Sequence, residues 1–240
     1  VAAVLAKDNA LMDVFKSGGN FHSSIAKKVF RLPCPVEEVA EKFSTQRQAA
    51  KAVTFGIMYG AGAAKISEQV TKDGGKLSVV QARQIIKEYF GAFWKLEEWI
   101  EQQKKLIMRD GSIYSHFGRK RRLPDVKSDN KGVQGHAVRS GLNFLVQSAA
   151  SDINLIGGVE AQAVLEQRKL KSKIFALVHD SVLAEVPLDE IDEYCDILRT
   201  EIQRDRGIYI SGAPVGCDFE IGDDYSMGKF ESKYGNIFNT

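Results

Sequence analysis

Four residues of one segment carry side chains that suit a bound nucleotide. The run Arg47-Gln-Ala-Ala-Lys51-Ala-Val-Thr-Phe55-Gly-Ile-Met-Tyr59-Gly60 spaces two cations and two aromatic rings four residues apart. Because each step of four turns a helix face by only about 40°, these side chains form one stripe on a single helix. The cations suit phosphate oxygens and the rings suit a sugar and base, so the stripe predicts a nucleoside triphosphate site. The competing interpretation is a surface helix that buries Phe55 and Tyr59 in the core.

A second candidate for chemistry is a carboxylate at a predicted tight turn. Two β-rich runs, 173–178 and 182–186, are separated by His179-Asp180-Ser181. The pattern predicts a hairpin with the polar triplet at its turn, so that Asp180 is exposed between two buried strands. Mg²⁺ prefers a few carboxylates together with phosphate oxygens and water. Asp180 is therefore the candidate metal ligand, and the alternative is an ordinary turn residue.

Polar and basic side chains in two further segments suit a nucleic acid. Arg139, Asn143 and Gln147 repeat the four-residue spacing on another predicted helix. Their polar heads suit minor-groove acceptors, which lie in similar places in every base pair. Residues 112–124 predict a hairpin whose basic tip, Arg119–Arg122, suits phosphates. The alternative for the tip is a solvated run of charge.

Helices must position most of these residues. Thr45 and Gln48 form a capping-box pattern at the start of the stripe helix, and Gly60-Ala61-Gly62 is typical of its end. The pattern predicts an α+β fold, a helical subdomain followed by helices packed on a small antiparallel sheet. The other expected elements are helices at 8–17, 21–31 (after a break at Gly18-Gly19), 63–72, 78–108 (bent near Gly91), 133–167 (with a weak point at Gly157-Gly158) and 188–203, and a strand near 214–221.

Composition narrows the class of protein. The 240 residues are 44% hydrophobic and 27% charged, which is typical of globular chains, and no apolar stretch predicts a membrane span. Three scattered cysteines indicate reduced thiols in a cytosol-like compartment. Net charge is only +2, but residues 1–180 hold 28 Lys and Arg against 18 Asp and Glu. This asymmetry is compatible with a polyanionic partner.

Together these motifs resemble family A (DNA polymerase I-like) DNA polymerases, from Val1 to about Gly222. The stripe resembles motif B, the fingers helix, and Val178-His179-Asp180 resembles motif C. The context of the stripe looks more like bacteriophage members of the family. The remaining matches are Gly118 to Asp125, similar to a Gly-Arg-Arg-x-x-Leu-Pro-Asp element, and Arg139, Asn143 and Gln147, similar to an Arg-x3-Asn-x3-Gln helix.

The resemblance implies roles in nucleotide binding. Lys51 would donate a proton to the departing pyrophosphate, and Arg47 and Lys51 would bind the triphosphate. His22 would be another triphosphate ligand, although a lone histidine at a helix start is more often structural. Phe55 would pack against the incoming sugar and base, and Phe rather than Tyr here goes with rejection of dideoxynucleotides. Tyr59 would lie near the templating base.

The resemblance also implies the reaction and its partners. The chain would add deoxynucleotides to a primer 3′ end on a template, using two Mg²⁺ ions with Asp180 as a catalytic ligand. Partners would be primer–template DNA and a dNTP, with a processivity factor as a further candidate. The compartment would be the cytoplasm, that of a bacterial host if the chain is phage-encoded. DNA contacts would come from Arg119, Arg121, Arg139, Asn143, Gln147 and His179. Residues 1–134 would form the fingers and 135–240 the C-terminal part of the palm.

Two departures from the family pattern matter. Ser181 stands where the family usually has Glu, so a third carboxylate is absent from the turn. Motif A, which supplies the other metal-binding Asp, is expected just before Val1, because Val1-Ala-Ala-Val-Leu-Ala-Lys-Asp8 resembles the helix that follows it. We therefore expect a fragment that is inactive alone and whose partner is the missing N-terminal part of the polymerase.

Two alternatives stay open. A fragment of a single-subunit RNA polymerase is favoured by Ser181, whereas Phe55 and the Arg139 helix argue against it. A non-catalytic DNA-binding segment is favoured by the second aspartate being absent.

Overall fold

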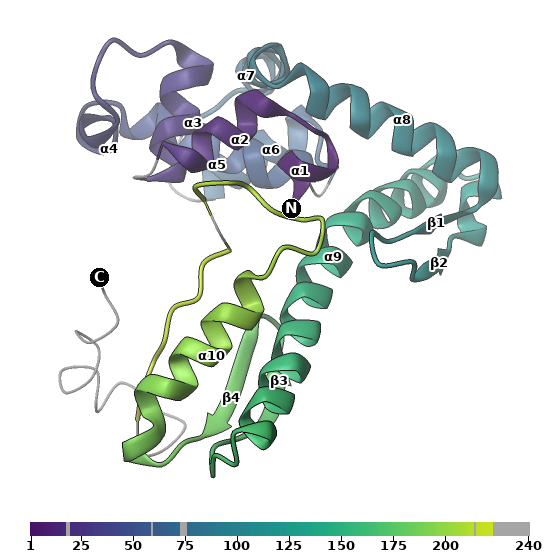
Figure 1. Ribbon diagram of the computed structural model, residues 1–240. Helices are drawn as coiled ribbons and strands as arrows, with labels where there is room; N and C mark the ends of the chain where they lie inside the picture. The colour runs from purple at the N-terminus through teal and green to yellow at the C-terminus, as the bar shows by residue number, and fades with distance from the viewer. Residues whose placement is uncertain (18–19, 59, 73–75, 214, 223–240) are drawn as a thin grey trace. The chain divides into compact units, whose positions relative to one another are not determined.

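The chain is mostly helical and forms two compact units. The computed structural model describes residues 1–17, 20–58, 60–72, 76–213 and 215–222, and Figure 1 shows their arrangement into elements. One unit contains Val1–Ala150 with Ile208–Ala213, and the other contains Ser151–Gly207 with residues 215–222. The described strands form two separate two-stranded antiparallel sheets. The α+β class is confirmed, whereas the fingers and palm boundary at 134/135 stays a prediction.

The first unit is a helical assembly with one small hairpin. Its core is continuous and contains large side chains that are fully buried, among them Val53, Tyr89, Phe93 and Leu96. Figure 1 shows α2, α3, α5 and α6 gathered together in this unit. Its elements are α1 (Ala2–Leu5), α2 (Asn9–Lys16), α3 (Phe21–Phe30), η1 (Val36–Glu38), α4 (Val39–Lys42), α5 (Ser44–Met58), α6 (Ala63–Lys72), α7 (Val79–Ala92), α8 (Trp94–Asp110), β1 (Ser112–Tyr114), β2 (Lys120–Arg122), η2 (Pro124–Lys127) and the start of α9 (Lys131–Gln167).

Asp8 ties two helix starts together. One carboxylate oxygen accepts a hydrogen bond from the Leu11 N–H at 3.0 Å, which caps α2. The other accepts from the Leu96 N–H at 3.1 Å, in the first turn of α8. Asp8 is only 2% exposed. A carboxylate can be buried here because both oxygens have backbone donors and both lie at helix N-termini, where negative charge is favoured.

The start of α5 differs from the prediction, whereas its end agrees with it. The helix begins at Ser44, so the prediction of Thr45 as its cap is wrong. The cause is α4, which leads directly into α5 through Phe43, whose carbonyl accepts from the Arg47 N–H at 3.0 Å. The C-terminal prediction is confirmed. Gly60 has a φ of 67°, and the Ala61 N–H donates to the Gly56 carbonyl at 2.7 Å, the bonding of a Schellman motif.

The predicted bend near Gly91 is a break between two helices. α7 ends at Ala92, and Phe93, with φ −128° and ψ 57°, separates it from α8. The hairpin that follows pairs Ser112 with Arg122 and Tyr114 with Lys120. Its basic residues lie mainly on strand β2 rather than at the tip, because the connecting turn occupies residues 115–119.

The second unit packs two helices and a hairpin around a smaller core. Figure 1 shows α10 running beside β4 and the later part of α9. Leu165 of α9 is fully buried, and Ile197 and Leu198 of α10 are almost so. The elements of this unit are the rest of α9, β3 (Lys173–Val178), β4 (Ser181–Glu185), η3 (Leu188–Glu190) and α10 (Ile191–Gln203).

The prediction of a weak point at Gly157-Gly158 is wrong. α9 runs through both glycines without interruption. A Cβ built on Gly157 would lie 2.6 Å from Ile202 Cδ1 and 3.1 Å from Ile202 Cα, and one on Gly158 would lie 3.2 Å from Leu177 Cδ2. The two glycines therefore let α10 and β3 approach the α9 backbone closely.

In the hairpin of the second unit, the turn is shorter than predicted and the strands are more exposed than predicted. Val178 pairs with Ser181, so the turn is the dipeptide His179-Asp180 rather than a triplet. The strands are not buried as predicted, since Phe175 is 66% exposed and Val178 is 41% exposed.

The predicted strand near 214–221 is absent from the described residues 215–222. Cys217, Phe219 and Ile221 still alternate inward as in a strand, and they pack against the core of this unit. The segment therefore has a strand's side-chain pattern without a strand's pairing, because no described strand bonds to it. Among the described residues, no helix is both long and apolar enough to cross a bilayer.

Candidate functional site

The predicted stripe lies on one continuous helix. Arg47, Lys51 and Phe55 are spaced four residues apart along α5, which packs against α3, α6 and α7. Phe55 is 50% exposed, so the interpretation that buries its ring in the core is wrong. Tyr59 lies outside the described residues. The opposite face of α5 supplies the core instead, through Ala49, Ala50, Val53 and Ile57.

The start of α3 meets this stripe. Asn20 caps α3, its side-chain oxygen accepting from the Ser23 N–H at 3.2 Å. The same oxygen accepts from Arg47 Nη2 at 3.4 Å, which fixes one end of the guanidinium. His22, in the first turn of α3, lies with its ring centroid 5.5 Å from that of Phe55. The tertiary structure thus brings His22, Arg47 and Phe55 together.

Asn20 was missed by the sequence reasoning. Its position three residues before Ser23 indicates a helix cap, and that signal was available in the sequence. Its contact with Arg47, 27 residues further on, carries no local signal because it depends on how α3 packs against α5.

The electrostatics of this cluster favour an anion. Burial lowers the pKa of His22 below its ordinary value of 6.5, and the nearby charges of Lys51 and Arg47 lower it further. The imidazole is therefore neutral at pH 7 beside two cations. In this cluster, two buried polar atoms have no hydrogen-bond partner among the described residues, namely His22 Nδ1 and Arg47 Nε. Such atoms cost about 1–3 kcal/mol each when left unpaired, so ligand oxygens or water would stabilise them.

The α9 candidates have different environments. Arg139 and Gln147 are exposed, and Asn143 is half-buried. The stem of Arg139 lies against Gly60, where an added Cβ would be 2.4 Å from Arg139 Cγ. The end of α5 and the start of α9 therefore meet at these two residues.

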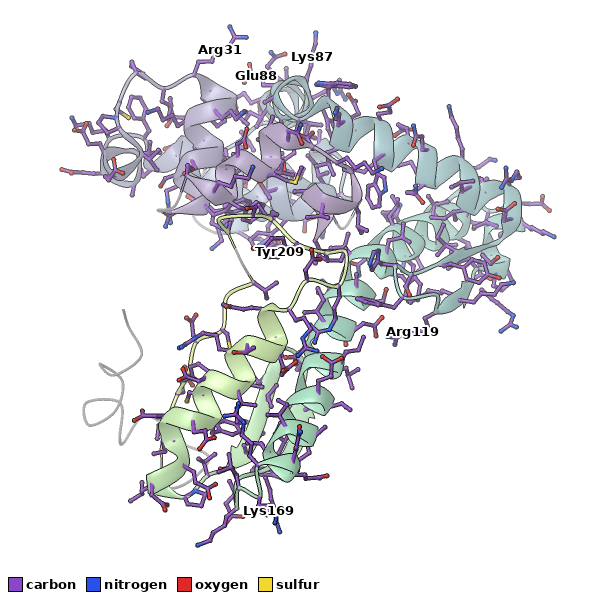
Figure 2. All side chains as sticks on the ribbon, in the orientation of Figure 1. Arg31, Lys87, Glu88, Arg119, Lys169 and Tyr209 are labelled. Carbon is purple, nitrogen blue, oxygen red and sulfur yellow. The ribbon has the colours of Figure 1, made fainter. Side chains whose placement is uncertain are left out.

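The basic strand β2 is anchored to α9. Arg121 Nη2 donates to Ser140 Oγ at 2.8 Å, and its guanidinium lies over the Phe144 ring at 5.5 Å. Arg119 is exposed on the hairpin, as Figure 2 shows. The hairpin thus presents positive charge to solvent while Arg121 holds it in place.

The predicted metal ligand lies in the second unit. Asp180 and His179 are both exposed at the β3–β4 turn, and His179 has a φ of 57°, which is uncommon outside glycine. Asp180 lies at the rim of a cavity of about 420 Å³ between β4, α10 and residues 216–222. No cluster of three His, Cys, Asp or Glu that could hold a metal occurs within the described ranges. Asp218 and Glu220 line the same cavity, but the described residues do not place them with Asp180 in such a cluster.

Two cysteine thiols line this cavity, and burial keeps them protonated. Burial raises the pKa of Cys195 to about 12 and raises that of Cys217 as well. The thiolate is the reactive form of cysteine, so both residues are apolar packing groups at neutral pH.

Comparison with known proteins defines the class. The model of DNA polymerase family A matches residues 1–227. The chain is 44% identical to the DNA polymerase of Escherichia phage T5 over 98% of its own length and 30% of the phage protein. It is 32% identical to DNA polymerase I of Caldicellulosiruptor bescii, over 85% of this chain and 23% of that protein.

Comparison with a solved structure indicates the same family. The POL domain of Pol1 from M. smegmatis, in complex with DNA primer-template and dNTP, matches with a TM-score of 0.77 and 26% identity. The match covers 90% of this chain and 36% of that one. The chain therefore belongs to DNA polymerase family A, and the identity with a phage enzyme confirms the likeness to bacteriophage members. It spans about a third or less of the length of these relatives.

Proposed function

We propose that this chain forms the nucleotide-binding fingers and the C-terminal palm of a template-directed DNA polymerase. The observation that carries the proposal is the cluster of His22, Arg47 and Phe55, with Lys51 on the same helix. It combines positive charge, unpaired polar atoms and a half-exposed ring within one compact unit. A triphosphate with its sugar and base satisfies all three features.

Each residue of the cluster takes one part of the nucleotide. Arg47, held by Asn20, binds phosphate oxygens through its remaining donors, and neutral His22 donates one hydrogen bond to them. Lys51 neutralises charge that develops on the leaving pyrophosphate and gives it a proton. Phe55 packs against the sugar and base. Tyr59, next along the stripe, is the proposed neighbour of the templating base.

The proposed DNA contacts do not distinguish one base sequence from another. Arg139, Asn143 and Gln147 approach the minor groove, where acceptors are alike in every base pair. Arg119 and Arg121 bind backbone phosphates, and His179 lies against the primer strand. Affinity for primer–template should therefore fall steeply with salt, because released counterions drive such binding.

Asp180 is the proposed metal ligand of the palm. Chemistry with two Mg²⁺ ions requires further carboxylates near Asp180, and no cluster of three possible ligands occurs in the described part of the chain. We infer that the others come from a segment outside the described residues, as the expected motif A would provide. The complete enzyme would work in the cytoplasm, that of a bacterial host if phage-encoded, with a processivity factor as a further candidate partner.

Primer extension by the complete polymerase tests the proposal. Lys51→Ala should lower the rate of dNTP incorporation by about 10²-fold or more, because a positioned proton donor contributes that much. Lys65→Ala is the matched control, since Lys65 is an exposed lysine of the next helix paired with Glu68. Its rate should stay within about twofold of wild type. Equal rates for the two variants would show that Lys51 does not contribute to catalysis.

The same assay separates the alternatives. Preference for rNTP over dNTP would favour a single-subunit RNA polymerase, as Ser181 suggests. Salt-sensitive duplex binding without any extension by the complete polypeptide would favour a non-catalytic DNA-binding segment. Preferential dNTP extension supports the DNA polymerase.

A further inference from the structure

Gly60 and Arg139 meet more closely than a side chain at position 60 would allow. A Cβ built on Gly60 would lie 2.4 Å from Arg139 Cγ, 2.8 Å from Cδ and 3.2 Å from Cβ. These are atoms near the root of the arginine side chain, so rotation of its far end would not relieve the overlap. The Arg139 stem therefore fits against the end of α5 only because residue 60 is glycine.

A second glycine lines the same side chain. Gly135, one helical turn before Arg139 on α9, would place a Cβ 3.1 Å from Arg139 Nη1. Gly60 thus borders the stem, and Gly135 borders the guanidinium. By contrast, a Cβ on Gly62, Gly91 or Gly118 would meet nothing within 4 Å. Gly56 and Gly141 also have close neighbours, Ile66 Cγ1 at 2.8 Å and Ile107 Cδ1 at 2.7 Å, but these are apolar side chains, whereas the neighbour of Gly60 is an exposed arginine.

A long arginine side chain loses considerable rotamer freedom when it binds a ligand. Close packing that already restricts its stem lowers that loss and directs the guanidinium. Arg139 is exposed, so its orientation affects what it can bind. Gly60 also terminates α5, the helix that carries the proposed nucleotide ligands. Gly60 therefore lies where α5 meets α9, the helix that carries the proposed minor-groove ligands.

We propose that Gly60 is a positioning residue that seats the Arg139 side chain for contact with primer–template DNA. The inference rests on the proposed function, because it takes Arg139 as a minor-groove ligand. It adds a residue without a side chain to the determinants of DNA binding. The role is distinct from the left-handed backbone of Gly60, which serves to end α5.

Gly111 provides a matched control for the backbone. It is the C-cap of α8 with a φ of 59°, and its added Cβ would come no nearer than 3.8 Å to another atom. Gly60→Ala and Gly111→Ala carry the same left-handed strain, but only the first overlaps Arg139. We expect the thermal midpoint of the full chain to fall by about 4 °C or more beyond the fall for Gly111→Ala. In an Arg139→Ala background, that excess should largely disappear.

Binding of a fluorescent primer–template duplex by the complete polymerase, at one fixed salt concentration, tests the role itself. Gly60→Ala should raise the Kd about fivefold, whereas Gly111→Ala should change it less than twofold. In the Arg139→Ala background, Gly60→Ala should add less than twofold. Gly60→Asn should restore part of the thermal midpoint, because Asn tolerates the left-handed region, but should keep the binding defect because it carries a Cβ.

Two results would overturn the inference. One is an equal loss of binding for Gly60→Ala and Gly111→Ala, and the other is a full Gly60→Ala effect without the Arg139 side chain. If the complete wild-type polymerase binds no duplex, the proposed function and the DNA role of Arg139 both fail. The thermal cycle would then still decide whether Gly60 seats the Arg139 stem.

Discussion

The imidazole of His22 lies against the ring of Phe55, with 5.5 Å between the ring centroids. His22 comes from α3 and Phe55 from α5, so the contact joins the two helices of the candidate nucleotide site. Phe21 extends this group, with its ring 5.3 Å from His22 and 4.6 Å from Phe15. The aromatic row fixes His22 next to the cations of α5.

The first prediction concerns sugar discrimination. Phe55→Tyr in the complete polymerase should increase incorporation of dideoxynucleotides by about tenfold or more, since a hydroxyl can supply the polar partner that the missing 3′-OH leaves unmatched. The ring is 50% exposed, so the thermal midpoint should hardly change. Chain-termination assays with mixed dNTP and ddNTP measure the effect. Phe15→Tyr, at a ring of similar exposure, should leave termination unchanged.

The second prediction concerns the carboxylate at the β3–β4 turn. Asp180→Ala in the complete polymerase should lower primer extension by about 10³-fold or more, because a metal ligand stabilises charge in the transition state. Primer–template affinity should stay within about twofold. Asp189→Ala, an exposed carboxylate of the same unit, is the control. Near wild-type extension by the Asp180 variant would show that the metal assignment is wrong.

The third prediction concerns the charge of His22. Its pKa should lie below 6.5, as burial and the charges of Lys51 and Arg47 require, and NMR titration of the imidazole measures it. Lys51→Ala should raise the pKa, and so should added pyrophosphate, whose negative charge favours the imidazolium. A pyrophosphate-independent pKa would argue against phosphate binding beside His22.

The same shift sets a pH dependence of stability. Between the folded-state pKa of His22 and 6.5, the unfolded chain binds a proton that the folded chain does not. The free energy of unfolding should therefore rise with pH through that window. The contribution is isolated by comparing urea unfolding of wild type and His22→Gln at several pH values. Identical pH profiles for the two proteins would contradict it.

The fourth prediction concerns the glycines of α9. Gly157→Ala should destabilise the chain by about 1–3 kcal/mol, because its Cβ would overlap Ile202 and the backbone of α10. Gly91→Ala, at an open position of α7, should be neutral or stabilising by about 0.5 kcal/mol. Urea unfolding measures both. A stabilising Gly157→Ala would mean that α10 does not need this close approach.

Much of the fold could be predicted from local sequence patterns. The stripe helix follows from the four-residue spacing of Arg47, Lys51 and Phe55, and its end follows from Gly60, because both depend on residues within a few positions. The β3–β4 hairpin was predictable for the same reason. The start of α5 was missed because α4 leads into it through Phe43, and a capping pattern at Thr45 does not report the helix before it.

The sequence by itself determined the family, the stripe of Arg47, Lys51 and Phe55, and the exposed turn at Asp180. These properties reside in residue types at short, regular spacings. Only the tertiary structure decided that Asn20 holds Arg47, that Gly60 borders Arg139, and that Gly157 and Gly158 are packing surfaces rather than weak points. Such contacts join residues far apart in the chain, and close packing of helices, not local propensity, brings them together. The structure also decided that residues 215–222 do not form the predicted strand. Their side chains alternate as in a strand, but a strand forms only beside another strand whose backbone it can bond.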